Sequence, residues 1–113
     1  MATAKEYRDY VLECLTRAGN VTVRAMMGEY CLYCDGKVIG LLCDDTLYLK
    51  QTETSNKLLP DAERGYPYDG SKTLMLIVED FEDTERMAEI LRAMPDELPE
   101  PKPKKRRMRA MEN

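Results

Sequence analysis

The residues best suited to chemistry in this chain are its four cysteines and its many carboxylates, because histidine is absent. Without histidine the usual general base, the Ser–His and Cys–His nucleophile pairs and the commonest nitrogen ligand of metals are missing. The phosphate-binding and hydrolase motifs GxxxxGK[ST], GxGxxG and GxSxG do not occur in the sequence either. We therefore predict that the protein is not an enzyme and uses no cofactor.

Cys31 and Cys34 form a CxxC motif, the spacing of zinc knuckles and of redox-active thiols. The two residues between them are Leu and Tyr, so the motif lies in an apolar run of strand length. Positions three apart in a strand point to opposite faces and do not converge on one metal. We predict no metal site here and interpret these cysteines, with Cys14 and Cys43, as small, buried apolar residues.

Paired carboxylates occur at Asp44-Asp45, Glu79-Asp80 and Glu82-Asp83. General acid–base catalysis needs two carboxylates with separated pKa values in a cleft. These pairs fall in expected turns and at an expected helix start, where Asp satisfies backbone N–H groups. Because this local role accounts for them, we assign no catalytic residue.

The strongest signal for a partner is the basic C-terminal segment. The chain has a net charge of −4, while residues 100–113 hold six basic and two acidic residues, so this segment carries +4 and the rest −8. Clustered bases attract phosphate without reading its sequence, and no aromatic residue is interleaved for base stacking. We interpret the segment as a contact for non-specific nucleic acid or another polyanion, or as a tail that only aids solubility. Its basic residues are Lys102, Lys104, Lys105, Arg106, Arg107 and Arg109.

Hydrophobic periodicity predicts amphipathic helices over residues 3–18 and 83–94. A shorter helix is expected between a Thr52 cap and Pro60. The expected end signals of the two long helices are a Thr3–Glu6 capping box, a left-handed Gly19 and a terminating Pro95.

Apolar runs separated by turn residues predict an antiparallel sheet between these helices. A short strand is expected at residues 21–23, after which Gly28 bends the chain, and turns are expected at Asp35-Gly36 and Asp44-Asp45. The strands of the resulting three-stranded meander are residues 30–34, 37–43 and 46–50. One or two strands follow, an edge segment at Tyr66-Pro67-Tyr68 and a buried strand at residues 73–78.

The sequence thus predicts an α+β fold: a helix, a three-stranded antiparallel meander, a short helix, one or two further strands and a C-terminal helix. With 113 residues there is room for one core, which we place in residues 1–98, followed by a Pro/Lys/Arg-rich, disordered tail over residues 99–113. No apolar run is long enough to span a membrane, and the N-terminus has no signal-peptide core. We expect a cytoplasmic protein with no membrane contact.

Arg24 lies between apolar neighbours in the first expected strand. Arginine on a half-buried strand usually has a partner. Two interpretations stay open: Arg24 anchors an acidic group, for example on a partner, or it is a charge on the outer face or beside a carboxylate of its own chain.

Several segments resemble the N-terminal domain of the TfoX/Sxy family. The run from Arg24 to Tyr30, the glycine hairpin at residues 36–40 and the strand at residues 45–50 follow that family's pattern, and the match covers about residues 3–98. The positions that carry the family motif are Arg24, Met26, Gly28, Tyr30, Gly36, Tyr48 and Lys50.

The resemblance implies the same order of helices and strands, a tendency to form homodimers, and a non-enzymatic regulatory or adaptor role. Family members include regulators of competence genes for DNA uptake, which act through protein partners at promoters. Those full-length regulators carry a second, helical C-terminal domain where this chain has the basic tail. The alternative function is a small-ligand or metal-binding domain that uses the cysteines and the Arg24 region.

Overall fold

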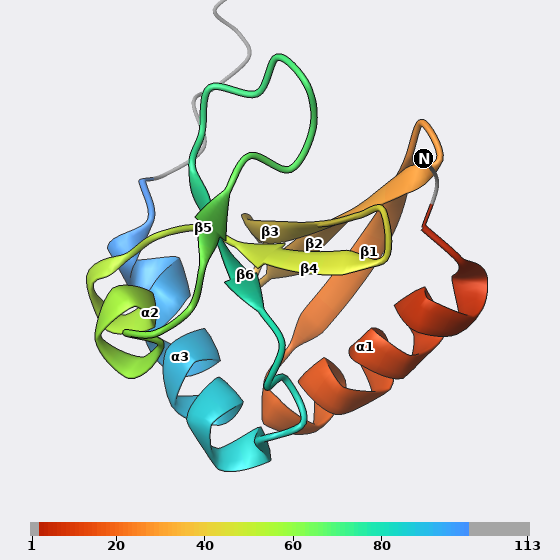
Figure 1. Ribbon diagram of the computed structural model, residues 1–113. Helices are drawn as coiled ribbons and strands as arrows, with labels where there is room; N and C mark the ends of the chain where they lie inside the picture. Colours follow the sequence, from red (N-terminus) through yellow and green to blue (C-terminus); the bar gives the residue numbers. More distant parts are fainter. Residues whose placement is uncertain (1–2, 100–113) are drawn as a thin grey trace, which may run out of the picture.

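A computed structural model describes residues 3–99 of the chain, and within these residues three helices lie on one face of a six-stranded sheet (Figure 1). The α+β class expected from the sequence is confirmed. None of the described helices is long and apolar enough to cross a membrane. The elements are α1 (Lys5–Ala18), β1 (Val21–Met26), β2 (Glu29–Cys34), β3 (Lys37–Cys43), β4 (Thr46–Leu49), α2 (Glu53–Leu58), β5 (Arg64–Gly65), β6 (Met75–Val78) and α3 (Thr84–Glu97).

The strands are antiparallel throughout and lie in the order β1-β2-β3-β4-β6-β5. The expected meander is confirmed and is one strand longer, because β1 continues to Met26 and pairs with β2 along its whole length. The register between β2 and β3 shifts between Leu32 and Tyr33, where Ile39 is the extra residue on β3. The two edge strands of the sheet are β1 on one side and the two-residue β5 on the other.

Three two-residue turns join the strands of the meander. Both central residues of each turn have positive φ: 52° and 87° at Met27-Gly28, 52° and 83° at Asp35-Gly36, and 52° and 54° at Asp44-Asp45. Positive φ at both positions is the type I′ geometry, which matches the twist of the flanking strands. The turns expected at 35–36 and 44–45 and the bend at Gly28 are confirmed.

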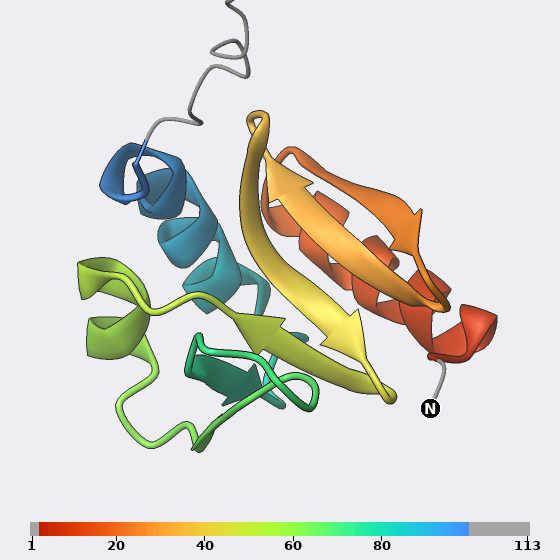
Figure 2. The same ribbon diagram turned by 90° about the horizontal axis from the view of Figure 1, so that it is seen from above.

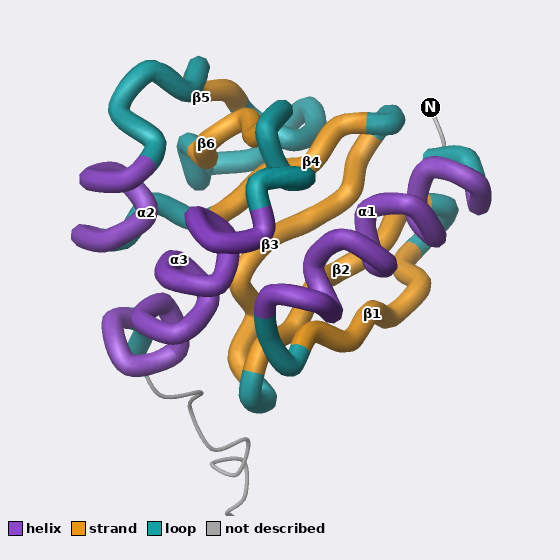
Figure 3. Tube along the Cα trace, turned by 90° about the horizontal axis from the view of Figure 1, so that it is seen from below, coloured by secondary structure: helices purple, strands orange, loops and turns teal. Residues whose placement is uncertain are grey.

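The hydrophobic core lies between the sheet and the helices, which cover the same face of the sheet (Figure 3). Every second residue of the strands points into it, because side chains alternate across a strand. The expected apolar faces of the two long helices supply the other side. The fully or nearly fully buried helical residues of this core are Val11, Cys14, Leu15, Met87, Ile90, Leu91 and Met94.

The capping box expected at the start of α1 is wrong. The Thr3 hydroxyl donates to Glu29 Oε1 at 2.6 Å, and the residue before the helix is Ala4, whose side chain makes no cap. The prediction that Gly19 adopts a left-handed conformation is also wrong, because its φ of −170° is extended. Gly19 is needed for space instead: a Cβ there would lie 3.1 Å from Leu91 Cβ, so α1 and α3 pack closely at this point.

Pro95 does not end α3, which continues to Glu97. A proline in a helix leaves the carbonyl four residues earlier without its backbone donor. Here that carbonyl, Leu91 O, accepts the Cys34 thiol at an Sγ–O distance of 3.7 Å. Lys37 Nζ donates to the Pro95 carbonyl at 2.6 Å, so the last turn is held by side chains of β2 and β3.

The segment Tyr66-Pro67-Tyr68 is not a strand. The edge strand lies just before it at β5, and β6 begins at Met75, two residues later than expected. Arg64 pairs with Leu76 and Gly65 with Met75, after which the chain leaves the sheet. The expectation of one edge segment and one buried strand is right, while the position of the edge strand is displaced.

Two glycines of β2–β4 should respond differently to alanine. A Cβ on Gly40 would lie 2.1 Å from the Tyr48 carbonyl oxygen, whereas Gly36 has no atom within 4 Å of that position and is limited by its φ of +83°. We expect Gly40→Ala to lower the free energy of unfolding by about 3 kcal/mol, and Gly36→Ala by about 1 kcal/mol. Urea titrations measure both, and equal losses would contradict the close approach at Gly40.

Candidate functional site

The face of the sheet that points away from the helices is crossed by one row of directly paired residues. The row runs over five strands from Arg24 through Cys31, Leu41 and Tyr48 to Ile77. Most of their neighbours along the strands belong to the core or pack against it, so the row faces the opposite side. Within residues 3–99 no helix covers this side, which we call the open face (Figure 2).

Arg24 is exposed on the open face and lies against an aromatic ring. Its guanidinium carbon is 6.0 Å from the centroid of the Tyr33 ring, a cation–π distance. Within the described residues no hydrogen bond or ion pair joins Arg24 to a carboxylate. Arg24 thus carries its charge on the outer face of the sheet, and its guanidinium is accessible to an acidic group on a partner.

The thiols of the CxxC motif point to opposite faces, as the alternation predicts. Cys31 lies on the open face, while Cys34 belongs to the core and its thiol reaches Leu91 O. All four cysteines are buried and none is in a disulfide. Among residues 3–99 no three Cys, Asp or Glu side chains are grouped to hold a metal ion.

Burial makes the cysteines poor nucleophiles. Loss of solvent, together with the nearby Glu29 carboxylate and Cys31 thiol, raises the pKa of the Cys43 thiol to about 11. Burial also raises the pKa of Cys34. Since the thiolate is the reactive form, both stay protonated and inert at neutral pH.

A surface cleft of about 570 Å³ lies between the loop after α2 and the start of α3. Four carboxylates line it together with Arg86, which lies 3.7 Å from Asp80 and 3.6 Å from Asp83. Its lining has no Ser, Thr, Cys, Lys or Tyr that a carboxylate could activate. Asp83 accepts a hydrogen bond from the Arg86 N–H at 3.2 Å, which confirms its expected capping role.

The seven motif residues do not gather in one pocket. Three of them, Arg24, Met26 and Tyr48, lie on the open face, and Cys31 and Leu41 lie between Arg24 and Tyr48 in the row. The others lie in the core (Tyr30), in turns (Gly28, Gly36) and just after β4 (Lys50).

Tyr30 and Lys50 connect elements of the fold. The Arg8 guanidinium of α1 lies 5.0 Å from the centroid of the Tyr30 ring, and its Nη1 donates to the Tyr30 hydroxyl at 3.5 Å. The Lys50 N–H donates to Ile39 O at 2.8 Å, while its carbonyl accepts the Ser55 hydroxyl at 2.9 Å. These contacts position α1 and α2 and leave the open face to other residues.

Exposed apolar side chains border the open face at two places that sequence reasoning missed. Met27 is 99% exposed in a turn position with positive φ, which bulky residues rarely occupy. On the other side, the loop after β5 rises away from the helices (Figure 1) and exposes Tyr66, Tyr68 and Leu74. The only signals in the sequence were the Met-Met pair before Gly28 and the Tyr-Pro-Tyr segment.

A polar cluster that the sequence did not predict ties the start of α1 to two turns. Glu29 Oε1 accepts the Thr3 hydroxyl at 2.6 Å and the Asp44 N–H at 3.1 Å. The Ala4 N–H donates to Asp45 Oδ1 at 2.8 Å. The Asp45 carboxylate thus has a structural role, as expected, while Asp44 takes part through its backbone N–H.

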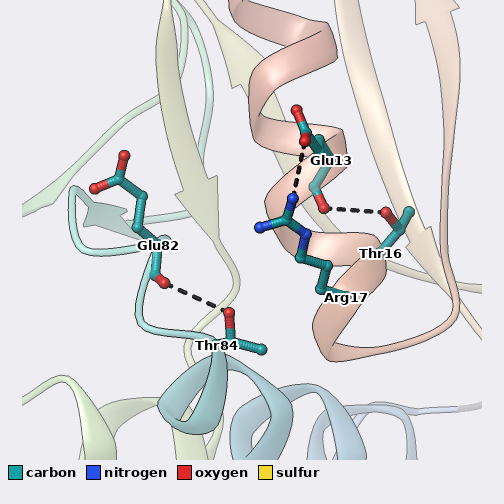
Figure 4. A network of polar contacts seen from close by, with 5 residues as sticks. All are labelled: Glu13, Thr16, Arg17, Glu82 and Thr84. Atoms are coloured by element: carbon teal, nitrogen blue, oxygen red, sulfur yellow. Dashed lines mark hydrogen bonds and ion pairs between the residues drawn. The ribbon is translucent and has the colours of Figure 1, made fainter.

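Other polar contacts are local to one helix or its start (Figure 4). Arg17 Nη2 lies 2.9 Å from Glu13 Oε2, with both side chains more than 60% exposed. The Thr84 hydroxyl donates to the Glu82 carbonyl at 3.5 Å before α3. Exposed pairs of this kind contribute about 0.5 kcal/mol or less, and they form no site.

The comparison with protein families agrees with the fold. The profile of the TfoX N-terminal domain matches residues 13–94, a range that includes all seven motif residues. The chain belongs to this family. An uncharacterized 12.7 kDa protein in the trpE 5′ region of Spirochaeta aurantia is 37% identical over 105 residues, covering 93% of this chain and 91% of the relative. Membership in the TfoX N-terminal domain family supports a regulator-type module.

The buried thiols can be tested by alkylation. In the native protein at pH 8 we expect Cys43 to react with iodoacetamide far more slowly than a free cysteine, because its pKa is about 11. The rate should rise as the pH approaches 11, and all four cysteines should react quickly in urea. Mass spectrometry of the digested protein locates the label. Rapid native labelling of Cys43 at pH 8 would contradict the burial and would favour the ligand-binding alternative.

Proposed function

We propose that this protein is a non-enzymatic regulatory or adaptor module that acts through protein partners in the cytoplasm and forms homodimers. Its basic tail adds a non-specific attraction to nucleic acid. The observation that carries the proposal is the open face, where helices cover only the other side of the sheet and Arg24 and Tyr48 share one row.

The composition of the open face and its border supports a protein partner. Interfaces between proteins are enriched in Tyr, Met and Arg relative to the rest of the surface. Tyr33, Tyr48 and Arg24 lie on this face, Met27 borders it on one side and Tyr66 on the other. The fitting partner surface is apolar with a carboxylate placed to meet Arg24.

The tail residues fall outside the part of the chain that the structure describes, so their role rests on charge. Six basic residues follow a body of net charge −8. Opposite signs in two parts of one chain favour different partners for each part. The tail then holds the module near a polyanion, while the sheet binds protein.

The alternative, a small-ligand or metal-binding domain that uses the cysteines and Arg24, has less support. Cys34 is in the core on the far side of the sheet from Arg24, and burial raises the pKa of Cys43. Cys31 is paired directly with Arg24, but among residues 3–99 it belongs to no group of Cys, Asp and Glu side chains that could hold a metal ion.

The tail is tested by titrating a labelled DNA duplex with the full chain and with a chain lacking residues 100–113, over a series of salt concentrations. For six basic residues we expect log affinity to fall with log salt with a slope no steeper than about −5. Truncation should abolish binding. A control tail with the same residues in scrambled order should bind equally well, since counterion release reads no sequence. No binding at low salt would contradict the nucleic-acid part of the proposal.

The open face is tested by a photo-crosslinking amino acid at Leu41, in the middle of the row, with Glu89 on the exposed side of α3 as the matched control. We expect protein adducts in cells from position 41 and not from position 89. The crosslinked protein is then purified and titrated against wild type and Arg24→Glu, which should bind at least tenfold more weakly. Equal adducts at both positions, or equal affinity of Arg24→Glu, would contradict a partner on the open face.

A further inference from the structure

The outer edge of β1 is a long unpaired strand edge. β1 has six residues, no proline and a regular register with β2 at every pair. The opposite edge, β5, has two residues and is followed by a loop. Natural proteins usually protect edge strands by making them short, bulged or charged, because unpaired edges recruit other strands. β5 is protected in this way and β1 is not.

The turn fixes which backbone groups of β1 point outward. In a two-residue type I′ hairpin the residues flanking the turn, here Met26 and Glu29, form a hydrogen-bonded pair. Pairs then alternate, so the N–H and C=O groups of Val21, Val23 and Ala25 face away from β2. The Val21 N–H donates to Gly19 O, but within residues 3–99 no hydrogen bond outside the sheet reaches Val23 or Ala25.

The side chains of β1 do not block the approach of another strand to this edge. Arg24 carries the single charge of β1, and it leans over the Tyr33 ring of β2, toward the sheet and away from the edge. Ala25 is exposed and Val23 is half-buried beside the core. The edge therefore offers backbone donors and acceptors between small apolar side chains.

We propose that β1 pairs antiparallel with β1 of a second copy, around a two-fold axis at Val23. Val23 lies opposite the partner's Val23, and Ala25 opposite the partner's Val21, so the outward-facing groups of both strands meet, except the Val21 N–H, which donates to Gly19 O. The two sheets become one continuous sheet, with the helices of both copies on the same side. The inference rests on the homodimer of the proposed function and states which surface forms it.

A second copy fits this edge because the strand is complementary to itself. In this register small apolar residues lie opposite each other on the helix side, and Arg24 lies opposite the partner's Thr22 on the open face, so no two like charges are paired directly. Five residues of each strand, 21 to 25, at about 3.3 Å each give a contact about 16 Å long. This is short for a standard interface of roughly 800 Å² per partner, so the dimer is reversible and depends on concentration.

The test uses the full chain and the variant Ala25→Pro. Proline removes the outward N–H and is tolerated at an edge whose ladder side is untouched, so β1 stays paired with β2. Ala25→Ser keeps the N–H and is the matched control. In sedimentation velocity from micromolar to millimolar protein, wild type and Ala25→Ser should shift from monomer to dimer, while Ala25→Pro stays monomeric with an unchanged circular dichroism spectrum.

A distance measurement identifies the register. Spin labels on Met27→Cys, an exposed position, should lie about 26 Å apart between backbones, because the proposed register separates the two turns by eight residues at about 3.3 Å. A dimer that persists in Ala25→Pro, or a label distance far from this value, overturns the edge pairing while self-association stands. A monomer at every concentration overturns both the edge pairing and the homodimer. The protein partner on the open face is tested separately, by crosslinking from position 41.

Discussion

The alternation of side chains along tightly connected strands governs this structure. Two-residue turns leave β1 to β4 no freedom of register, so each strand sends one set of residues to the helices and the other set to the opposite face. The first set forms a core with α1 and α3. The second set has no helical layer in the described chain, and the open face follows directly from this one-sided arrangement.

Hydrophobic periodicity and turn chemistry were enough to predict most of the fold. Asp35-Gly36 and Asp44-Asp45 mark turns by local preference, and local signals of this kind survive in the structure. The errors lie where a distant residue supplies the partner. Thr3 bonds to Glu29 instead of capping its own helix, and Cys34 serves the carbonyl that Pro95 leaves without a donor. No pattern within one segment reveals such contacts.

The candidate site was predictable only in part, for a related reason. The motif singled out Arg24 and Tyr48, and alternation alone showed that Cys31 and Cys34 face opposite ways. To see that Arg24, Cys31 and Tyr48 lie in one row, one needs the register of four strands. This register includes the shift beside Ile39, which changes the face of every later residue on β3. Met27 is exposed because it occupies a turn position with positive φ, and a methionine in the sequence does not predict such a backbone conformation.

The surfaces that the helices leave uncovered are, in this interpretation, the ones that bind. Amide hydrogen exchange followed by NMR at two protein concentrations tests it most directly, since it reports single N–H groups of β1. The Thr22 and Arg24 amides, which point to β2, should exchange slowly throughout. Those of Val23 and Ala25 should exchange quickly in dilute protein and slowly in concentrated protein. Amides of Val23 and Ala25 that exchange at the same rate at both concentrations would contradict the account.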